Sequence, residues 1–331
     1  MRVIHHTLKN ASGLNRVATN MAIAEKLLGI DSVLSYTNEP NCEVAPDDPN
    51  MMRVVPVDKA KEADIHVVHS HLPDRAKGKT VFVAHGTPEH CFNTAIEQGK
   101  VSGYAAGDPW MLSLHRIDTC DVTVTFWPRH AYIWQSMNPK ADVRVIPMGV
   151  DKEFWKPVES QGKWVGSPSL FTCENSHQIK WPLDLILAFP LIMKETDAVL
   201  HAHYLPLDQH RYWFPLLQAN GSSYKSYASG AYFDQPSLRN AFSSVDYYLN
   251  LVRYGDFNTV GLEAKASGCK VISYKGNPYA DFHISEGSQL TMAEELVTII
   301  KGEVGPRTEI SNVPTCEAMA REMIQIYKEI R

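Results

Sequence analysis

The segment Arg253–Gly268 contains residue types that suit an anion and a diol. Asn258 is typical of a helix N-cap and Gly268 of the position after a helix, so a short helix is predicted between them. If a parallel strand precedes this helix, the free N–H groups of Asn258–Val260 and the positive end of the helix dipole form an anion site. The chemistry predicted here is the binding of a phosphate.

Glu263 would lie on the same helix, half buried beside Val260 and Ala264. A carboxylate in such a position needs a partner. One alternative is a ribose diol, which would make Glu263 a ligand-binding residue. The other is that Glu263 is solvated, or pairs with Lys265 or with a lysine elsewhere. The spacing alone does not choose between them.

Histidines follow two of the apolar runs. His85 comes directly after Val81–Ala84, so it is either a half-buried core residue or a ligand contact at the carboxyl end of a strand. His69 and His71 end the run that begins at Ile65, and they would share one face because side chains alternate along a strand. No third ligand follows at a diagnostic spacing, so we expect no metal site and favour the wall of a binding site.

Other kinds of chemistry lack their motifs. The sequence contains no G-x-x-x-x-G-K-[ST] phosphate loop, no G-x-G-x-x-G and no G-x-S-x-G nucleophile elbow. It also contains no D-x-D, so a metal-bridged diphosphate has no obvious pair of ligands. These absences remove kinase-type, dinucleotide-binding and serine-hydrolase mechanisms from consideration.

Short apolar runs alternate with amphipathic stretches, which favours parallel sheets covered by helices. Strands are predicted at Arg2–His5, Ser32–Tyr36, Arg53–Pro56, Ile65–His69, Thr80–Ala84, Val122–Thr125, Val143–Ile146, Ser169–Cys173, Ala198–His203, Tyr247–Leu251 and Lys270–Tyr274, with a further candidate at Tyr224–Tyr227. Helices are predicted at Leu14–Leu28, Pro182–Lys194, Ser237–Phe242, Thr259–Ser267 and Thr315–Ile330.

Periodicity fades between Met148 and Gly166, where proline and glycine gather, so a domain boundary is expected there. We therefore predict two doubly wound α/β domains, at 1–150 and 151–314, and a C-terminal helix at 315–331 that packs back on the first domain. In open α/β sheets, ligands bind at the carboxyl ends of the strands.

Composition agrees with two folded domains. The chain has 331 residues, 44% of them hydrophobic and 21% charged. The net charge of −5 supplies no overall basic field for a polyanion. The first residues lack the apolar core of a signal peptide, no run is long enough to span a membrane, and the cysteines are scattered. We expect a cytoplasmic protein.

Six segments carry a resemblance to a known family, and they follow that family's order along nearly the whole chain. They are Ser12-Gly13, Ala63–His71, Val81–Gly86, Ile146–Asp151, Ser176–Pro182 with Lys180, and Gly261–Gly268. The chain resembles the GT-B-fold glycosyltransferases of family 4, which are retaining and depend on nucleotide sugars. The resemblance implies two Rossmann-like, doubly wound α/β domains that face each other across a cleft, with the acceptor side on the N-terminal domain (1–150) and the nucleotide-sugar-binding site on the C-terminal domain (151–314).

The resemblance also implies an activity: transfer of a hexosyl or pentosyl group from a nucleotide diphosphate sugar to an acceptor hydroxyl, with retention of configuration. A UDP sugar is the leading donor, although the sequence does not distinguish UDP from GDP or ADP. No tightly bound cofactor and no metal are expected. The implied donor-binding residues are Gly13, Lys180, Arg253, Asn258, Thr259, Val260 and Glu263. The implied catalytic residues are His85, Lys180 and Asp256, and those on the acceptor side are His69, His71 and Arg16.

The sequence departs from the family pattern at two places. The first Glu of the family's E-x7-E motif falls on Gly255, with Asp256 as its substitute, and the usual Arg before Lys180 is Asn175. A sugar-nucleotide epimerase or hydrolase on the same scaffold, and a catalytically silent nucleotide-sugar-binding subunit, therefore stay open. The acceptor is a glycan, lipid, small molecule, protein or modified DNA base, and the oligomeric state is open.

Overall fold

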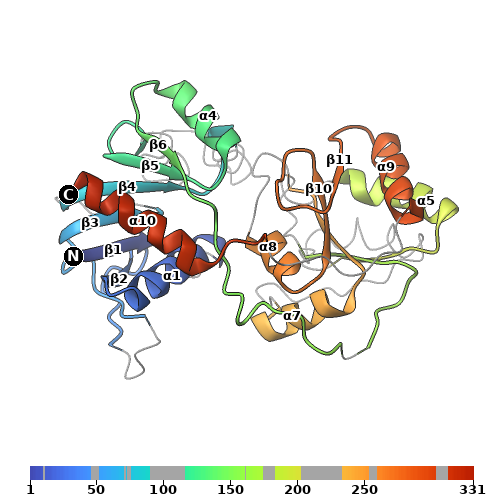
Figure 1. Ribbon diagram of the computed structural model, residues 1–331, viewed down its shortest axis with the longest axis horizontal. Coiled ribbons are helices and arrows are strands. Elements are labelled where there is room, and N and C mark those ends of the chain that lie inside the picture. The colour runs from blue at the N-terminus through green and yellow to red at the C-terminus, as the bar shows by residue number, and fades with distance from the viewer. Residues whose placement is uncertain are drawn as a thin grey trace. The chain divides into compact units, whose positions relative to one another are not determined.

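The computed structural model describes residues 1–9, 12–45, 52–70, 72, 76–89, 116–160, 162–173, 183–202, 233–252, 259–302 and 312–331. The chain divides into two compact units (Figure 1). Unit 1 consists of Met1–Asp151 and Pro314–Arg331, and unit 2 of Lys152–Val313. Unit 1 is therefore built from both ends of the chain.

The sheet of unit 1 has six described strands, all parallel, in the order β2-β1-β3-β4-β5-β6. The strands are β1 (Arg2–Thr7), β2 (Asp31–Tyr36), β3 (Glu62–Val68), β4 (Lys77–Ala84), β5 (Val122–Thr125) and β6 (Val143–Val145). The chain runs from β1 to β2 on one side and then continues at β3 on the other. This reversal makes a topological switch point between β1 and β3, where α/β sheets bind ligands.

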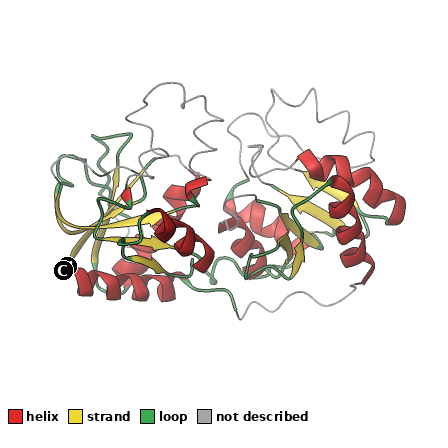
Figure 2. Ribbon diagram, turned by 90° about the horizontal axis from the view of Figure 1, so that it is seen from above, coloured by secondary structure: helices red, strands yellow, loops and turns green. Residues whose placement is uncertain are grey.

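Helices cover both faces of this sheet. They are α1 (Ser12–Leu27), α4 (Pro128–Met137) and α10 (Cys316–Ile330). On one face α1 packs Ala18 and Ala22 against Leu34 of β2, and α10 lies alongside α1 (Figures 1 and 2). On the other face Trp134 of α4 meets Phe82 of β4 edge to face, with ring centroids 5.8 Å apart.

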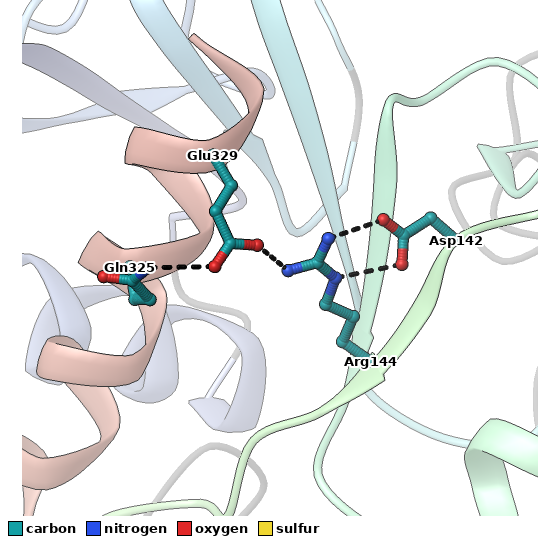
Figure 3. Close-up of polar contacts among 4 residues, drawn as sticks. All are labelled: Asp142, Arg144, Gln325 and Glu329. Carbon is teal, nitrogen blue, oxygen red and sulfur yellow. Dashed lines mark hydrogen bonds and ion pairs between the residues drawn. The ribbon is translucent and has the colours of Figure 1, made fainter.

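Polar contacts tie α10 to the sheet. Arg144 on β6 donates both to Asp142, at 2.9 and 2.8 Å, and to Glu329 on α10 (Figure 3). Asp64 of β3 accepts a hydrogen bond from the backbone N–H of Arg2 at 2.8 Å. It also forms an ion pair at 3.2 Å with Arg331, the residue that caps the end of α10. The two ends of the chain therefore meet at one carboxylate.

The glycine of the segment Ile146–Asp151 has a packing role. Val150 and Thr315 form a parallel bridge, in which the Val150 N–H donates to Pro314 and the Cys316 N–H donates to Val150. A Cβ on Gly149 would lie 2.3 Å from the Thr315 carbonyl oxygen. Only glycine fits this close approach of two backbones.

The sheet of unit 2 has five described strands, all parallel, in the order β11-β10-β9-β7-β8. The strands are β7 (Ser169–Thr172), β8 (Val199–Ala202), β9 (Tyr247–Asn250), β10 (Lys270–Tyr274) and β11 (Phe282–Ile284). The chain reverses direction across the sheet between β7 and β9, which is the second topological switch point.

Four described helices flank this sheet, and α5 and α9 pack together on its main core. The helices are α5 (Leu183–Glu195), α7 (Gln235–Ser244), α8 (Thr259–Ala266) and α9 (Gln289–Gly302). Phe242 of α7 contacts Phe171 and Tyr248, with ring centroids 5.9 and 5.2 Å away. The cap of α7 is Asp234, whose side chain accepts from the Ser237 N–H at 2.8 Å.

The predicted elements agree with the structure, except at a few places. The run Arg53–Pro56 forms only isolated bridges at Val54 rather than a strand. The sequence patterns missed α4, α9 and β11. The candidate strand Tyr224–Tyr227 lies outside the described residues.

Candidate functional site

Strand register places three histidines on one face of the unit 1 sheet. His5 of β1 is paired with Val67 of β3, and Val67 with Val81 of β4. His69 lies two residues after Val67, and His85 four residues after Val81. Because side chains alternate along a strand, His5, His69 and His85 point to the same side. His69 and His85 follow the last residues of their strands, at the carboxyl edge of the sheet.

These histidines form a continuous chain of hydrogen bonds that ends on a buried carboxylate. His85 Nε2 lies 2.8 Å from His69 Nδ1, and His69 Nε2 lies 3.1 Å from His5 Nδ1. His5 Nε2 lies 2.9 Å from Glu25 Oε2, which also accepts from the Ser32 hydroxyl at 2.8 Å. The phenol of Tyr327, on α10, donates to Glu25 Oε1 at 2.7 Å. We call Tyr327, Glu25, His5, His69 and His85 the Glu25 chain.

Burial sets the protonation of this chain. His5, Glu25 and Tyr327 are 0% exposed and His69 is 2% exposed, whereas His85 is half-buried. Burial lowers the pKa of His85 to about 3, and burial with the neighbouring histidines holds the pKa of His69 well below its usual value. Burial and the adjacent Glu25 raise the pKa of Tyr327 well above its usual value, so its phenol stays protonated.

A second pair of histidines lies on the opposite face of the same strands. His6 Nε2 lies 2.9 Å from His66 Nδ1, and His66 Nε2 lies 3.0 Å from the Lys77 carbonyl oxygen. Both side chains are 0% exposed, and burial lowers the pKa of each. We call these two residues the His66 pair.

The three residues expected on the acceptor side and Gly13, which is expected to bind the donor, have different environments. His69 is an internal member of the Glu25 chain, so it acts on a ligand only through His85. Arg16, in α1, is half-buried and has interaction partners. Gly13 is exposed in the first turn of α1, and no described atom lies within 4 Å of a Cβ built on it. His71 lies outside the described residues.

In unit 2, Glu263 is 0% exposed, within a helix whose other residues are almost all buried. It is therefore not solvated. Lys265, its other candidate partner, pairs with Asp281 at 2.9 Å. At the start of the helix Thr259 is buried and Val260 is half-buried. The alternative in which Glu263 is solvated is therefore excluded, and Glu263 has an interaction partner.

The topology relates α8 to the two neighbouring strand ends. The segment before α8 follows β9, and the segment that contains Lys180 follows β7, so both leave the sheet at its switch point. The predicted site residues Lys180, Arg253, Asp256 and Asn258 lie outside the described residues.

No group of three or more His, Cys, Asp or Glu side chains in the described ranges is placed to hold a metal ion. No helix within them has the length and apolar character needed to cross a membrane.

Sequence patterns missed three members of the Glu25 chain: His5, Glu25 and Tyr327. Glu25 lies four residues after Met21 on the buried stripe of α1, so an acidic residue in an apolar stripe was the available signal. Tyr327 likewise follows Met323 by four residues on the stripe of α10. The sequence separation of 302 residues between Glu25 and Tyr327 hides their contact from any local pattern.

Comparison with known proteins identifies the fold. No protein-family model matches the chain, and no curated protein matches it in sequence. Three solved structures are similar over almost their full length. Sucrose-phosphate synthase from Thermosynechococcus elongatus has a TM-score of 0.72 and 14% identity, with 99% of each chain covered. HepE from Anabaena in complex with UDP has a TM-score of 0.69 and 11% identity, with 99% of this chain and 100% of that chain covered. A glycosyltransferase from Rickettsia africae has a TM-score of 0.64 and 14% identity, with 99% of this chain and 98% of that chain covered. HepE was also solved in complex with UDP-glucose. The two parallel sheets and these similarities show that the chain has the GT-B fold, with two Rossmann-like α/β domains.

Proposed function

We propose that the protein is a glycosyltransferase that takes a sugar from a nucleotide diphosphate sugar, with a UDP sugar as the donor. The GT-B fold extends over the whole chain, and HepE, which shares it, binds UDP and UDP-glucose. The observation that carries the proposal is the fully buried carboxylate of Glu263, on the helix that follows β9 at the switch point of unit 2. A carboxylate buried there suits the two hydroxyls of a ribose.

On the donor side, Glu263 accepts hydrogen bonds from the ribose. The N–H groups of Thr259 and Val260, at the start of α8, bind the diphosphate, because a helix N-terminus favours negative charge. Lys180 adds a cation that stabilises the leaving diphosphate. Arg253, Asn258 and Gly13 complete the proposed donor-binding set.

On the sugar and acceptor side, His85 contacts the transferred hexosyl or pentosyl group, and Asp256 replaces the missing first Glu of E-x7-E. Arg16 and His71 line the path of the acceptor hydroxyl, and His69 supports His85 from behind. Transfer proceeds with retention of configuration, needs no metal, and takes place in the cytoplasm.

The test begins with donor binding. Thermal shift with UDP, GDP and ADP sugars selects the donor, and calorimetry then compares Glu263→Gln and Lys180→Ala with the unchanged protein. Each lost charged contact is expected to weaken donor binding about tenfold to a hundredfold, which corresponds to about 1.5–3 kcal/mol. The control is Glu294→Gln, an exposed residue of α9 that should leave affinity unchanged. Equal donor affinity in all four proteins would remove the site assignment.

A second measurement separates transfer from the alternatives. Release of nucleotide diphosphate is followed with and without glycan, lipid and DNA acceptors. Release that requires an acceptor supports transfer. Release without one supports a hydrolase, which the Gly255 substitution favours. Conversion of the sugar without release supports an epimerase, and tight binding with neither supports a silent subunit.

A further inference from the structure

The Glu25 carboxylate gives the Glu25 chain a direction. Glu25 Oε1 accepts from Tyr327 and Oε2 accepts from Ser32, and Oε2 also lies 2.9 Å from Nε2 of His5. An ionised carboxylate only accepts hydrogen bonds, so His5 must carry its proton on Nε2. Its Nδ1 is then a lone pair that accepts from His69.

The same reasoning passes to the end of the chain. His69 donates from Nε2 to His5, so its Nδ1 carries the lone pair that accepts from His85. His85 therefore carries its proton on Nε2 and has a lone pair on Nδ1. Among the described residues no hydrogen-bond partner is recorded for this Nδ1, and His85 is the one half-buried member of the chain.

We propose, building on the proposed glycosyltransferase function, that the Glu25 chain is a proton relay that holds Nδ1 of His85 as an acceptor for a substrate hydroxyl and conducts the proton from that hydroxyl to His5. Within the Glu25 chain His85 is the catalytic residue, because it is the only one of these five residues that touches the substrate. His69, His5, Glu25 and Tyr327 are positioning residues that act through it.

The proton step balances without any other reactant. The hydroxyl O–H bond breaks, an N–H bond forms at Nδ1 of His85, and the oxygen keeps the electron pair with which it attacks the sugar. His85 then passes its Nε2 proton to Nδ1 of His69, and His69 passes its own Nε2 proton to Nδ1 of His5. The positive charge ends on His5, beside the Glu25 carboxylate, and the leaving diphosphate takes the electron pair of the broken sugar–oxygen bond. The reverse passage releases the proton after the product leaves.

Charge placement explains why a chain is needed. A buried imidazole with a pKa near 3 holds a proton poorly at neutral pH, so His85 alone would be a weak base. His5 lies 2.9 Å from a carboxylate, so a positive charge that reaches His5 has a negative group beside it. The described polar groups around the chain are Ser32 of β2 and Tyr327 of α10 at Glu25, with His6 next to His5 on the other face.

The first test reads the proton positions and needs no substrate. In protein with ¹⁵N-labelled histidine, NMR distinguishes an N–H nitrogen from a lone-pair nitrogen, and single His→Gln variants assign the signals. At pH 8 we expect Nε2–H forms of His5, His69 and His85. On acidification His5 should become doubly protonated while the protons of His69 and His85 move to Nδ1.

Two results of this test would overturn the relay. One is an Nδ1–H form of His85 at pH 8. The other is an acid form in which His85 is the imidazolium and His5 is neutral. If acid unfolds the protein first, the proton positions at pH 8 decide the matter.

The second test uses turnover and a matched control. Glu25→Gln keeps the volume of the side chain and removes its charge, so we expect kcat to fall about tenfold to a hundredfold. Its donor Kd should stay within twofold, and its kcat should depend more steeply on pH. The control His66→Gln changes an equally buried residue that has no path to His85, and should change kcat less than twofold. Equal losses of kcat in the two variants would overturn the relay.

The two proposals fail in different ways. An unchanged protein that neither binds a nucleotide sugar nor turns one over removes the glycosyltransferase function, whereas the NMR result still decides whether the chain conducts protons.

Discussion

His5 and His6 are neighbours on β1, yet they begin two buried networks with different ends. The Glu25 chain joins a half-buried histidine at the sheet edge to a carboxylate. The His66 pair runs from His6 to the Lys77 carbonyl oxygen, and no partner among the described residues contacts His6 Nδ1. His5 and His6 have the same residue type, are equally buried and belong to the same strand. The group at each end therefore decides whether a row of imidazoles can take up a proton or only fill the core.

A carbonyl oxygen fixes the direction of the His66 pair as firmly as Glu25 fixes that of its chain. His66 donates from Nε2 to Lys77, and His6 donates from Nε2 to His66. However, a neutral carbonyl gives an imidazolium little stabilisation, and both histidines are fully buried. The comparison shows that directionality is not sufficient for proton transfer.

The largest expected difference between the two networks is in stability. Glu25→Ala leaves the Tyr327 phenol, the Ser32 hydroxyl and the His5 N–H without their acceptor, and we expect the free energy of unfolding to fall by about 3–5 kcal/mol. His66→Ala removes hydrogen bonds to one neutral histidine and one carbonyl, and we expect a loss of about 1–3 kcal/mol. Urea denaturation of both variants measures the difference. Equal losses would mean that the Glu25 carboxylate contributes no more to the stability of unit 1 than His66 does.

The second prediction concerns a property that the two networks share. Burial lowers the pKa values of His6, His66, His69 and His85 below about 6.5, the value of an unfolded histidine. Below that pH the unfolded chain binds protons that the folded chain does not. The stabilising effect is therefore complete above about pH 6.5. As the pH falls below this value, the free energy of unfolding decreases by up to about 1.4 kcal/mol per pH unit for each histidine.

Denaturation between pH 8 and pH 5 checks this dependence. His66→Gln and His69→Gln should both reduce the slope, and His69→Gln should reduce it more, because burial and the neighbouring histidines hold the pKa of His69 further below its usual value. A slope that neither substitution changes would show that these histidines do not control the acid sensitivity.

The third prediction removes one hydrogen bond and leaves the rest of the Glu25 chain in place. Tyr327→Phe deletes the phenol that donates to Glu25, and we expect a loss of about 1–2 kcal/mol in the free energy of unfolding. Tyr132→Phe is the control, since Tyr132 on α4 is 77% exposed and should change stability little. A similar effect of both substitutions would mean that the hydrogen bond between Tyr327 and Glu25 does not contribute measurably to stability.

The smallest effect is expected at the surface contact that also holds α10. Arg144 is 33% exposed and Glu329 42% exposed, so solvent and salt weaken their ion pair. Arg144→Ala should cost less than about 1 kcal/mol. A double-mutant cycle with Glu329→Ala at low and high salt measures the coupling. A coupling larger than the effect of Tyr327→Phe would mean that the surface pair, rather than the buried phenol, dominates the attachment of α10.

Local patterns predicted most of the fold, because apolar periodicity marks the buried faces of strands and helices. They missed α4, whose buried residues are His130 and Trp134, and they also missed α9, although its buried residues Met292, Ala293, Leu296 and Ile300 are all apolar. At the site, the position of His85 after an apolar run left two interpretations open, and the family resemblance made it a candidate site residue. The burial of His69 could not be predicted, because alternation gives the face of a strand but not what covers that face. The partners Glu25 and Tyr327 come from two helices that only the tertiary fold brings together.

The contact between Glu25 and Tyr327 also has a consequence for synthesis of the protein. Domains form as units while the chain emerges, beginning with the N-terminal one. Here Glu25 emerges early and its phenol donor 302 residues later, after the whole of unit 2 has been made. A nascent chain can assemble the sheet of unit 1 but must keep a buried carboxylate incompletely bonded. The unit whose first residues leave the ribosome first is thus the one completed last.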